Sequence, residues 1–234
     1  MLHTLWSKLF RLNDPRSSGS ISGEQSDNQL ERGMTAMDTR FQNIISNVEP
    51  LPDSIYGPRY RCALMLKDGT HIPCAILQSK TKLVELAKRR IKEEMSGGGK
   101  LGGPDPYGQI LSVFVAGGNK VNDYDVASAT LSRYAPPLPL LKQIHGETTM
   151  GWTGWVFEMK DGKMFSYGSS YTMEFFDLPE GYSFDDVVKV HNHSFLSLEG
   201  SLVGLERGGK PPVDYCIDKL LRERVYFTCH IDGI

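Results

Sequence analysis

The chain has 234 residues, of which 40% are hydrophobic and 23% are charged, so it is long enough to bury one sizeable core. Its 26 basic and 28 acidic residues nearly balance, and a net charge of −2 argues against a domain built mainly to hold nucleic acid. No apolar run approaches 18 residues and no export signal is recognisable, so we expect a cytoplasmic protein without a transmembrane segment. In that compartment its four cysteines are expected to be buried thiols: Cys62, Cys74, Cys216 and Cys229.

Residues 1–33 are expected to form a flexible arm with a short amphipathic helix at its tip. Its apolar residues recur at helical spacing: Leu2, Leu5, Trp6 and Leu9. A helix of about three turns is marginal in water, so it needs a surface to dock on. Residues 13–33 are rich in serine, glycine and charge, which is typical of a linker. We expect the helix to bind a protein partner or a second copy of the chain; packing on its own core and anchoring at a membrane surface are the alternatives.

Residues 34–49 form a second amphipathic stretch, which we expect to be helical and to end before Pro50. Residues 50–234 are expected to form a single core domain. It opens with a hairpin around Asp68-Gly69-Thr70, in which six alternating apolar residues are predicted to share one face: Cys62, Leu64, Leu66, Ile72, Cys74 and Ile76. A second hairpin around Asp161-Gly162-Lys163 should place five more on one face: Trp155, Phe157, Met159, Phe165 and Tyr167.

Helices are predicted for residues 80–95, for about 122–134 and for 211–222, and further strands for 109–116 and 224–231. This order indicates an α+β fold, with a mixed, mostly antiparallel sheet built from the two hairpins and helices packed on it. Both hairpins carry Lys-Asp-Gly at the turn, and whether this marks an internal duplication stays open.

The segment around His191 and His193 is the first candidate site. If residues 188–193 form a regular strand, the two imidazoles point to the same side. Two such rings can bind Zn²⁺, although a catalytic zinc needs a third protein ligand and an activated water.

The local pattern resembles the JAMM/MPN-type zinc hydrolases, whose motif is His-x-His, seven residues, Ser, two residues and Asp. Here His191-Asn192-His193 is followed by Ser201, and Gly204 stands at the position of the aspartate ligand. The resemblance implies zinc-dependent hydrolysis of peptide or isopeptide bonds, with a catalytic glutamate upstream. Its candidates are Glu147, Glu158 and Glu174.

The second candidate is a turn that joins a predicted buried strand to a predicted helix, at Gly117, Gly118 and Asn119. Backbone N–H groups at the start of such a helix can hold an anion. Because no catalytic motif is complete, the leading prediction is a protein-interaction or binding module without catalysis. A metal-dependent hydrolase centred on His191 and His193 is the alternative.

Overall fold

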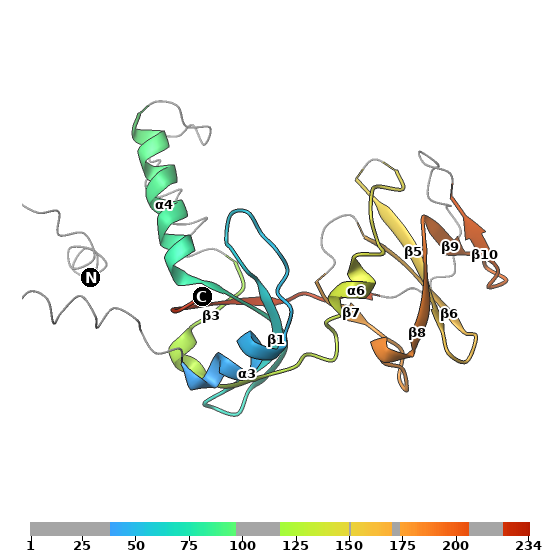
Figure 1. The fold of residues 1–234 in the computed structure, drawn as a ribbon, viewed down its shortest axis with the longest axis horizontal. Coiled ribbons are helices and arrows are strands. Elements are labelled where there is room, and N and C mark those ends of the chain that lie inside the picture. Colours follow the sequence, from blue (N-terminus) through green and yellow to red (C-terminus); the bar gives the residue numbers. More distant parts are fainter. Residues whose placement is uncertain (1–37, 97–117, 150, 170–173, 206–221) are drawn as a thin grey trace, which may run out of the picture. The chain divides into compact units, whose positions relative to one another are not determined.

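The computed structural model describes residues 38–96, 118–149, 151–169, 174–205 and 222–234 (Figure 1). The predicted arm, the strand expected at 109–116 and nearly all of the helix expected at 211–222 lie outside these residues. Three α-helices are found within them: α3 (Thr39–Asn47), α4 (Lys80–Met95) and α6 (Leu138–Leu141). The helix predicted for residues 80–95 is confirmed.

The first sheet has five strands in the order β3-β12-β2-β1-β4. Their bounds are Tyr60–Leu66 (β1), His71–Ser79 (β2), Lys120–Val121 (β3), Val126–Thr130 (β4) and Phe227–Ile231 (β12). β12 lies between β2 and β3 and runs parallel to both, whereas the other pairs are antiparallel. The expected α+β class, mixed and mostly antiparallel, is confirmed.

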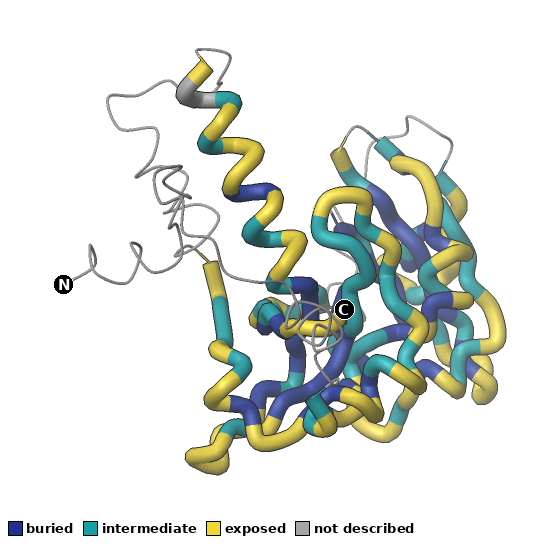
Figure 2. The backbone as a smooth tube through the Cα atoms, turned by 60° about the vertical axis from the view of Figure 1, so that its left-hand side comes forward, coloured by how far each residue is buried: buried dark blue, intermediate teal, exposed yellow. Residues whose placement is uncertain are grey.

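One face of this sheet is apolar and is covered by α3. Phe41 and Ile44 of the helix pack on Cys62, Leu64 and other strand residues, all of them buried. Figure 2 colours the backbone by burial, with buried stretches in dark blue. The carboxylate of Asp38 accepts a hydrogen bond from the Arg40 N–H at 3.0 Å and so caps the helix. Arg40 Nη1 also donates to the carbonyl oxygens of Asp123 (2.7 Å) and Val126 (2.6 Å), which ties the helix to the edge strand β4.

A β-bulge changes the facing of β2 part-way along the strand. Leu64 pairs with Ile72, but Cys62 pairs with Ala75, so β2 carries one more residue than β1 between these two pairs. The extra residue falls at Pro73, which has no N–H to give to the ladder and is tolerated in sheets at such irregularities. The prediction that six hairpin residues share one face is therefore wrong. Ile72, Ala75 and Leu77 face α3, and Cys74 and Ile76 belong to a separate cluster on the other face.

The second sheet has three strands in the order β6-β5-β8, with β5 at Thr153–Met159, β6 at Met164–Ser169 and β8 at Val187–Asn192. The five apolar residues predicted to share a face of this hairpin lie in one buried cluster, so that prediction is confirmed. Two-stranded pairings complete the set: β9 (Ser194–Leu196) with β10 (Leu202–Gly204), and β7 (Phe176–Asp177) with β11 (Arg222–Glu223). The two hairpins thus belong to separate sheets.

The helix expected from residue 122 is wrong. A single 3₁₀ turn at Asp123–Asp125 is followed at once by β4, which pairs with β1. Val126 and Ala129 are buried, and packing against β1 and α3 outweighs the local helix-start signal of Asn122 and Asp123.

The described cysteines are buried free thiols: Cys62, Cys74 and Cys229. Burial raises the pKa of the Cys62 thiol, and it raises the pKa of the Cys229 thiol to about 12. Cys216 lies outside the described residues. No helix within the described residues is long and apolar enough to cross a membrane.

Candidate functional site

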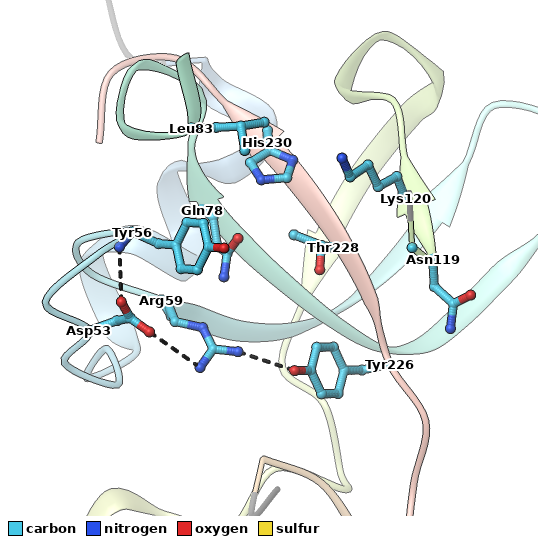
Figure 3. Close-up of a pocket in the computed structure, with 11 residues that line it drawn as sticks. Asp53, Tyr56, Arg59, Gln78, Leu83, Asn119, Lys120, Tyr226, Thr228 and His230 are labelled. Atoms are coloured by element: carbon cyan, nitrogen blue, oxygen red, sulfur yellow. Dashed lines mark hydrogen bonds and ion pairs between the residues drawn. The ribbon is translucent and has the colours of Figure 1, made fainter. Parts of the chain in front are cut away.

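A pocket of about 260 Å³ lies on the face of the five-stranded sheet opposite α3 (Figure 3). On β12, Cys229 and Ile231 point into the apolar core, so Thr228 and His230, which alternate with them, face the other way. The residues that line the pocket are Asp53, Tyr56, Arg59, Gln78, Leu83, Gly118, Asn119, Lys120, Tyr226, Thr228 and His230.

Strand register brings these polar side chains together. Thr228 pairs with Lys120 of β3, and His230 pairs with Gln78 of β2, so members of each pair point to the same face. β12 runs parallel to both β2 and β3, and the pocket extends along them from Lys120 and Tyr226 at the beginnings of β3 and β12 to Gln78 and His230 near the ends of β2 and β12. The bulge at Pro73 contributes, because it turns Gln78 away from the apolar face that holds Ile72.

Arg59 forms one wall of the pocket and is held from three sides. Its Nη1 lies 3.1 Å from Glu174 Oε1 and 3.9 Å from Asp53 Oδ2, and its Nη2 donates to the Tyr226 hydroxyl at 3.3 Å. Asp53 also accepts from the Tyr56 N–H at 2.9 Å, which fixes the turn before β1. The guanidinium is therefore positioned before any ligand arrives.

A second arginine lies behind this wall. Arg61 is only 4% exposed, and its Nη1 donates to the backbone carbonyl of Glu174 at 3.2 Å. Burial lowers the pKa of Arg61 to about 10, which still leaves it charged at neutral pH. Within the described residues, Arg59 Nε, Arg61 Nε and Glu174 Oε2 are buried without a hydrogen-bond partner. Arg59 and Arg61 thus share Glu174 at the base of the pocket, and Asp53 is a second carboxylate near Arg59.

His230 is neutral at physiological pH. Burial, and then the charges of Lys120 and Lys80, lower its pKa to about 4. Its ring therefore offers one N–H donor and one acceptor nitrogen. The Lys80 charge is itself balanced, since Nζ lies 3.0 Å from both Asp123 and Asp232.

His191 and His193 are held in separate contacts. His191 Nε2 lies 2.8 Å from Glu158 Oε2, across the pairing of β8 with β5. β8 ends at Asn192, and His193 has a left-handed φ of 52°, so the regular strand assumed for residues 188–193 does not reach His193. Its Nδ1 lies 2.9 Å from Thr148 Oγ1.

Hydrogen-bonding groups hold the His193 ring at both of its nitrogens. Asn192 Nδ2 donates to the carbonyl of His145 at 2.8 Å and lies 3.1 Å from His193 Nε2. Thr148 Oγ1, which lies against Nδ1, also accepts from the Gly154 N–H at 3.0 Å. Both ring nitrogens are engaged in fixing the loop onto the sheet.

The remaining motif positions give no further ligand close to the pair. Ser201 is exposed and Gly204 pairs with Ser194 in the β9–β10 ladder. Of the candidate glutamates, Glu158 contacts His191, while Glu174 is committed to Arg59 and Glu147 is exposed. Among the described residues, no group of three or more His, Cys, Asp or Glu side chains is arranged to hold a metal ion.

Two of the three residues in the predicted ligand turn, Gly118 and Asn119, line the pocket. Gly117 lies outside the described residues, as do the arm residues Leu2, Leu5, Trp6 and Leu9. Asn119 leads into strand β3, not into a helix, so helix N–H groups do not contribute there.

Sequence reasoning missed Arg59, Lys120, Thr228 and His230. One signal was present: along the final strand, polar Thr228 and His230 alternate with apolar Cys229 and Ile231. No protein-family model, curated protein or solved structure matches the chain. The function of the pocket can therefore be inferred only from the chemistry of its own side chains.

Proposed function

We propose that the chain is a binding module, acting without catalysis, and that the pocket on the sheet takes a small anionic molecule. The main support for this proposal is the positive charge of side chains at the pocket. Three cations, Arg59, Arg61 and Lys120, lie in or behind the pocket, against the two carboxylates of Asp53 and Glu174. Gln78 and Thr228 supply uncharged polar groups, as specific ligand sites do.

The depth of these groups strengthens the argument. The Arg59 side chain is 15% exposed, and burial lowers the pKa of Lys120. Charges in such half-buried places are less screened by water than surface charges, so an anion gains more from them. A volume of about 260 Å³ is enough for a small anion.

Thermal unfolding of the full chain with sodium sulfate or phosphate tests the proposal. At ten times the dissociation constant, binding stabilises by about 1.4 kcal/mol, which corresponds to a rise of roughly 3–5 °C in Tm for a chain of this size. Sodium chloride at equal ionic strength controls for screening. Lys120→Met should remove most of the rise. Lys67→Met, which removes an exposed lysine at the β1–β2 turn, should leave it intact.

An unchanged Tm with every small anion, after subtraction of the chloride effect, would refute the proposal. Equal loss of the response in Lys120→Met and Lys67→Met would also refute it, because the response would then reflect net charge alone.

Metal-dependent hydrolysis remains the second candidate, and the contact of Glu158 with His191 favours it. A carboxylate beside the first motif histidine is one element that a hydrolase of that type would use. Metal analysis of the purified chain is the test. Zinc, nickel, manganese or iron at under about a tenth of an equivalent, with no thermal shift on metal addition, would eliminate this candidate.

We also propose a cytoplasmic location and association with a protein partner or a second copy through the arm residues Leu2, Leu5, Trp6 and Leu9. Their helical spacing supports this. Deleting residues 1–33 should leave the Tm unchanged and shift the size-exclusion profile toward the monomer, or abolish pull-down of the partner. Identical profiles before and after deletion would remove the support.

A further inference from the structure

A second hollow, of about 390 Å³, adjoins the anion pocket. The two share Asn119 and Tyr226 and therefore border one another at these residues; the pair of hollows is called the depression below. The second hollow is otherwise lined by Glu223, Arg224 and Val225. A ligand that fills both would be larger than an inorganic anion.

The charged groups of the second hollow are already engaged. Arg224 Nη1 lies 3.0 Å from Asp177 Oδ2, and its guanidinium carbon lies 4.0 Å from the centre of the Tyr134 ring. Glu223 Oε2 accepts hydrogen bonds from Tyr167 and Ser169, each at 3.2 Å.

What the second hollow offers a ligand is therefore mainly apolar. Val225 is 78% exposed, the most exposed of the large hydrophobic residues in the described part of the chain. Beside it lies the ring of Tyr226, which packs on Phe175 at a centroid distance of 5.7 Å. An apolar or planar group placed here would cover both residues and remove apolar surface from water.

We propose that the depression takes a phosphate monoester with an apolar or planar group, and this rests on the anion-binding function proposed above. The phosphate lies among Lys120, Thr228 and His230, and the organic group extends over Val225 and Tyr226. Figure 3 shows that Tyr226 stands at the edge of the first pocket, with its hydroxyl toward Arg59. A molecule that passes this residue therefore runs from the polar part of the depression to its apolar part.

The number of donors favours a phosphate over a carboxylate. Lys120, the amides of Gln78 and Asn119, the Thr228 hydroxyl and the neutral His230 ring all carry N–H or O–H groups at the first pocket. A carboxylate has two acceptor oxygens, whereas a phosphate monoester presents three besides its ester oxygen. The larger set of acceptors matches donors that come from three strands and a loop.

Calorimetric titration of the full chain with methyl phosphate, phenyl phosphate and benzoate separates these contributions. Methyl and phenyl phosphate carry the same charged group, so the ratio of their dissociation constants isolates the ring. We expect phenyl phosphate to bind at least about tenfold more tightly than methyl phosphate, and benzoate to bind more weakly than phenyl phosphate.

Two variants assign the parts of the ligand to the two hollows. Val225→Ser should reduce the preference for phenyl phosphate to about threefold or less and leave methyl phosphate unchanged. Thr228→Val should weaken both phosphates by a similar factor. The matched control is Val188→Ser, which alters an exposed valine of the other sheet (57% exposed) and should change neither.

Equal affinity for methyl and phenyl phosphate would overturn the inference and leave anion binding intact. A preference for phenyl phosphate that survives Val225→Ser would overturn the placement of the ring. Benzoate that binds as tightly as phenyl phosphate would overturn the phosphate assignment. Absence of binding by all three compounds, together with sulfate, would overturn the proposed function itself.

Discussion

Glu174 contacts Arg59 through its side chain and Arg61 through its backbone. The carboxylate lies 3.1 Å from Arg59 Nη1, and the carbonyl accepts from Arg61 Nη1 at 3.2 Å. Glu174, two residues before β7, is thereby joined to the beginning of β1 at the base of the candidate site. Arg61 is buried and has Glu174 as its acidic neighbour, which makes this a sensitive point of the fold.

Glu174→Gln should therefore lower the free energy of unfolding by about 3 kcal/mol, because it leaves the buried Arg61 without its acidic neighbour and leaves Arg59 only the more distant carboxylate of Asp53. Urea unfolding measures this. Glu180→Gln, at an exposed glutamate, should change the value by less than about 0.5 kcal/mol.

Arg61→Met, by contrast, should change the free energy of unfolding only slightly. It replaces a buried cation by an apolar side chain of similar length and leaves the Arg59–Glu174 pair in place. We expect a change within about 1 kcal/mol of zero, since such replacements are often neutral or stabilising. A loss as large as that of Glu174→Gln would show that Arg61 contributes an attraction that its contacts do not account for.

Acid should destabilise the free protein through His230. In the unfolded chain this ring takes up a proton near pH 6.5, but in the folded chain it does so only near pH 4. Between these values the unfolded state binds more protons, so stability falls as the pH falls. His230→Gln should flatten this part of the stability profile, measured by urea unfolding from pH 7 to pH 4.

A bound anion should raise the pKa of His230, because its negative charge stabilises the protonated ring and offsets the repulsion from Lys120 and Lys80. Sulfate keeps its charge over this range, so its affinity should rise as the pH falls from 7.5 to 5, and His230→Gln should reduce the rise. An affinity for sulfate that is independent of pH in the native sequence would contradict contact between the anion and His230.

Thr148→Val should lower the free energy of unfolding by about 2 kcal/mol. The buried hydroxyl accepts from the Gly154 N–H and contacts His193 Nδ1, and valine leaves both without that partner. Thr149→Val, at the neighbouring and less buried position, should cost under about 0.5 kcal/mol. Equal effects at the two positions would show that the hydrogen bonds of Thr148 make no particular contribution to stability.

The Trp152 ring lies over two glycines that face each other in the β5–β6 ladder, Gly154 and Gly168. A methyl group at either glycine would overlap the ring, so Gly154→Ala should destabilise by about 2 kcal/mol. Combining it with Trp152→Leu should recover part of the loss in a double-mutant cycle. Gly204→Ala is the matched control, because nothing lies within 4 Å of its added methyl.

The second hairpin could be predicted from the sequence, and the first only in part. In β5 and β6, alternation alone placed Trp155 and Tyr167 in one cluster, because no irregularity interrupts either strand at that point. In β2, the bulge at Pro73 changes the facing of every later residue. The proline was visible in the sequence, but the direction of its effect depends on how β1 pairs with it.

The candidate site could not be predicted because its residues come from separate segments. Arg59 precedes β1, Lys120 begins β3, and Thr228 lies on a strand whose parallel pairing carries no local signal. The histidine pair illustrates the opposite difficulty. Its spacing predicted that both rings point to one side of a strand. The strand ends at Asn192, however, and His193 has a left-handed backbone, so strand alternation does not apply to it.

The position of β12 between β2 and β3 has a consequence for biosynthesis. The ribosome completes β2 about 150 residues before β12, which at 5–20 residues per second is a delay of roughly 7–30 s. During that interval the nascent chain presents the apolar residues Ala75, Ile76 and Leu77 along an open strand edge, which is a template for wrong pairing. Synthesis in the cell thus leaves a period in which a chaperone, or slow release from the ribosome, would protect the chain from aggregation.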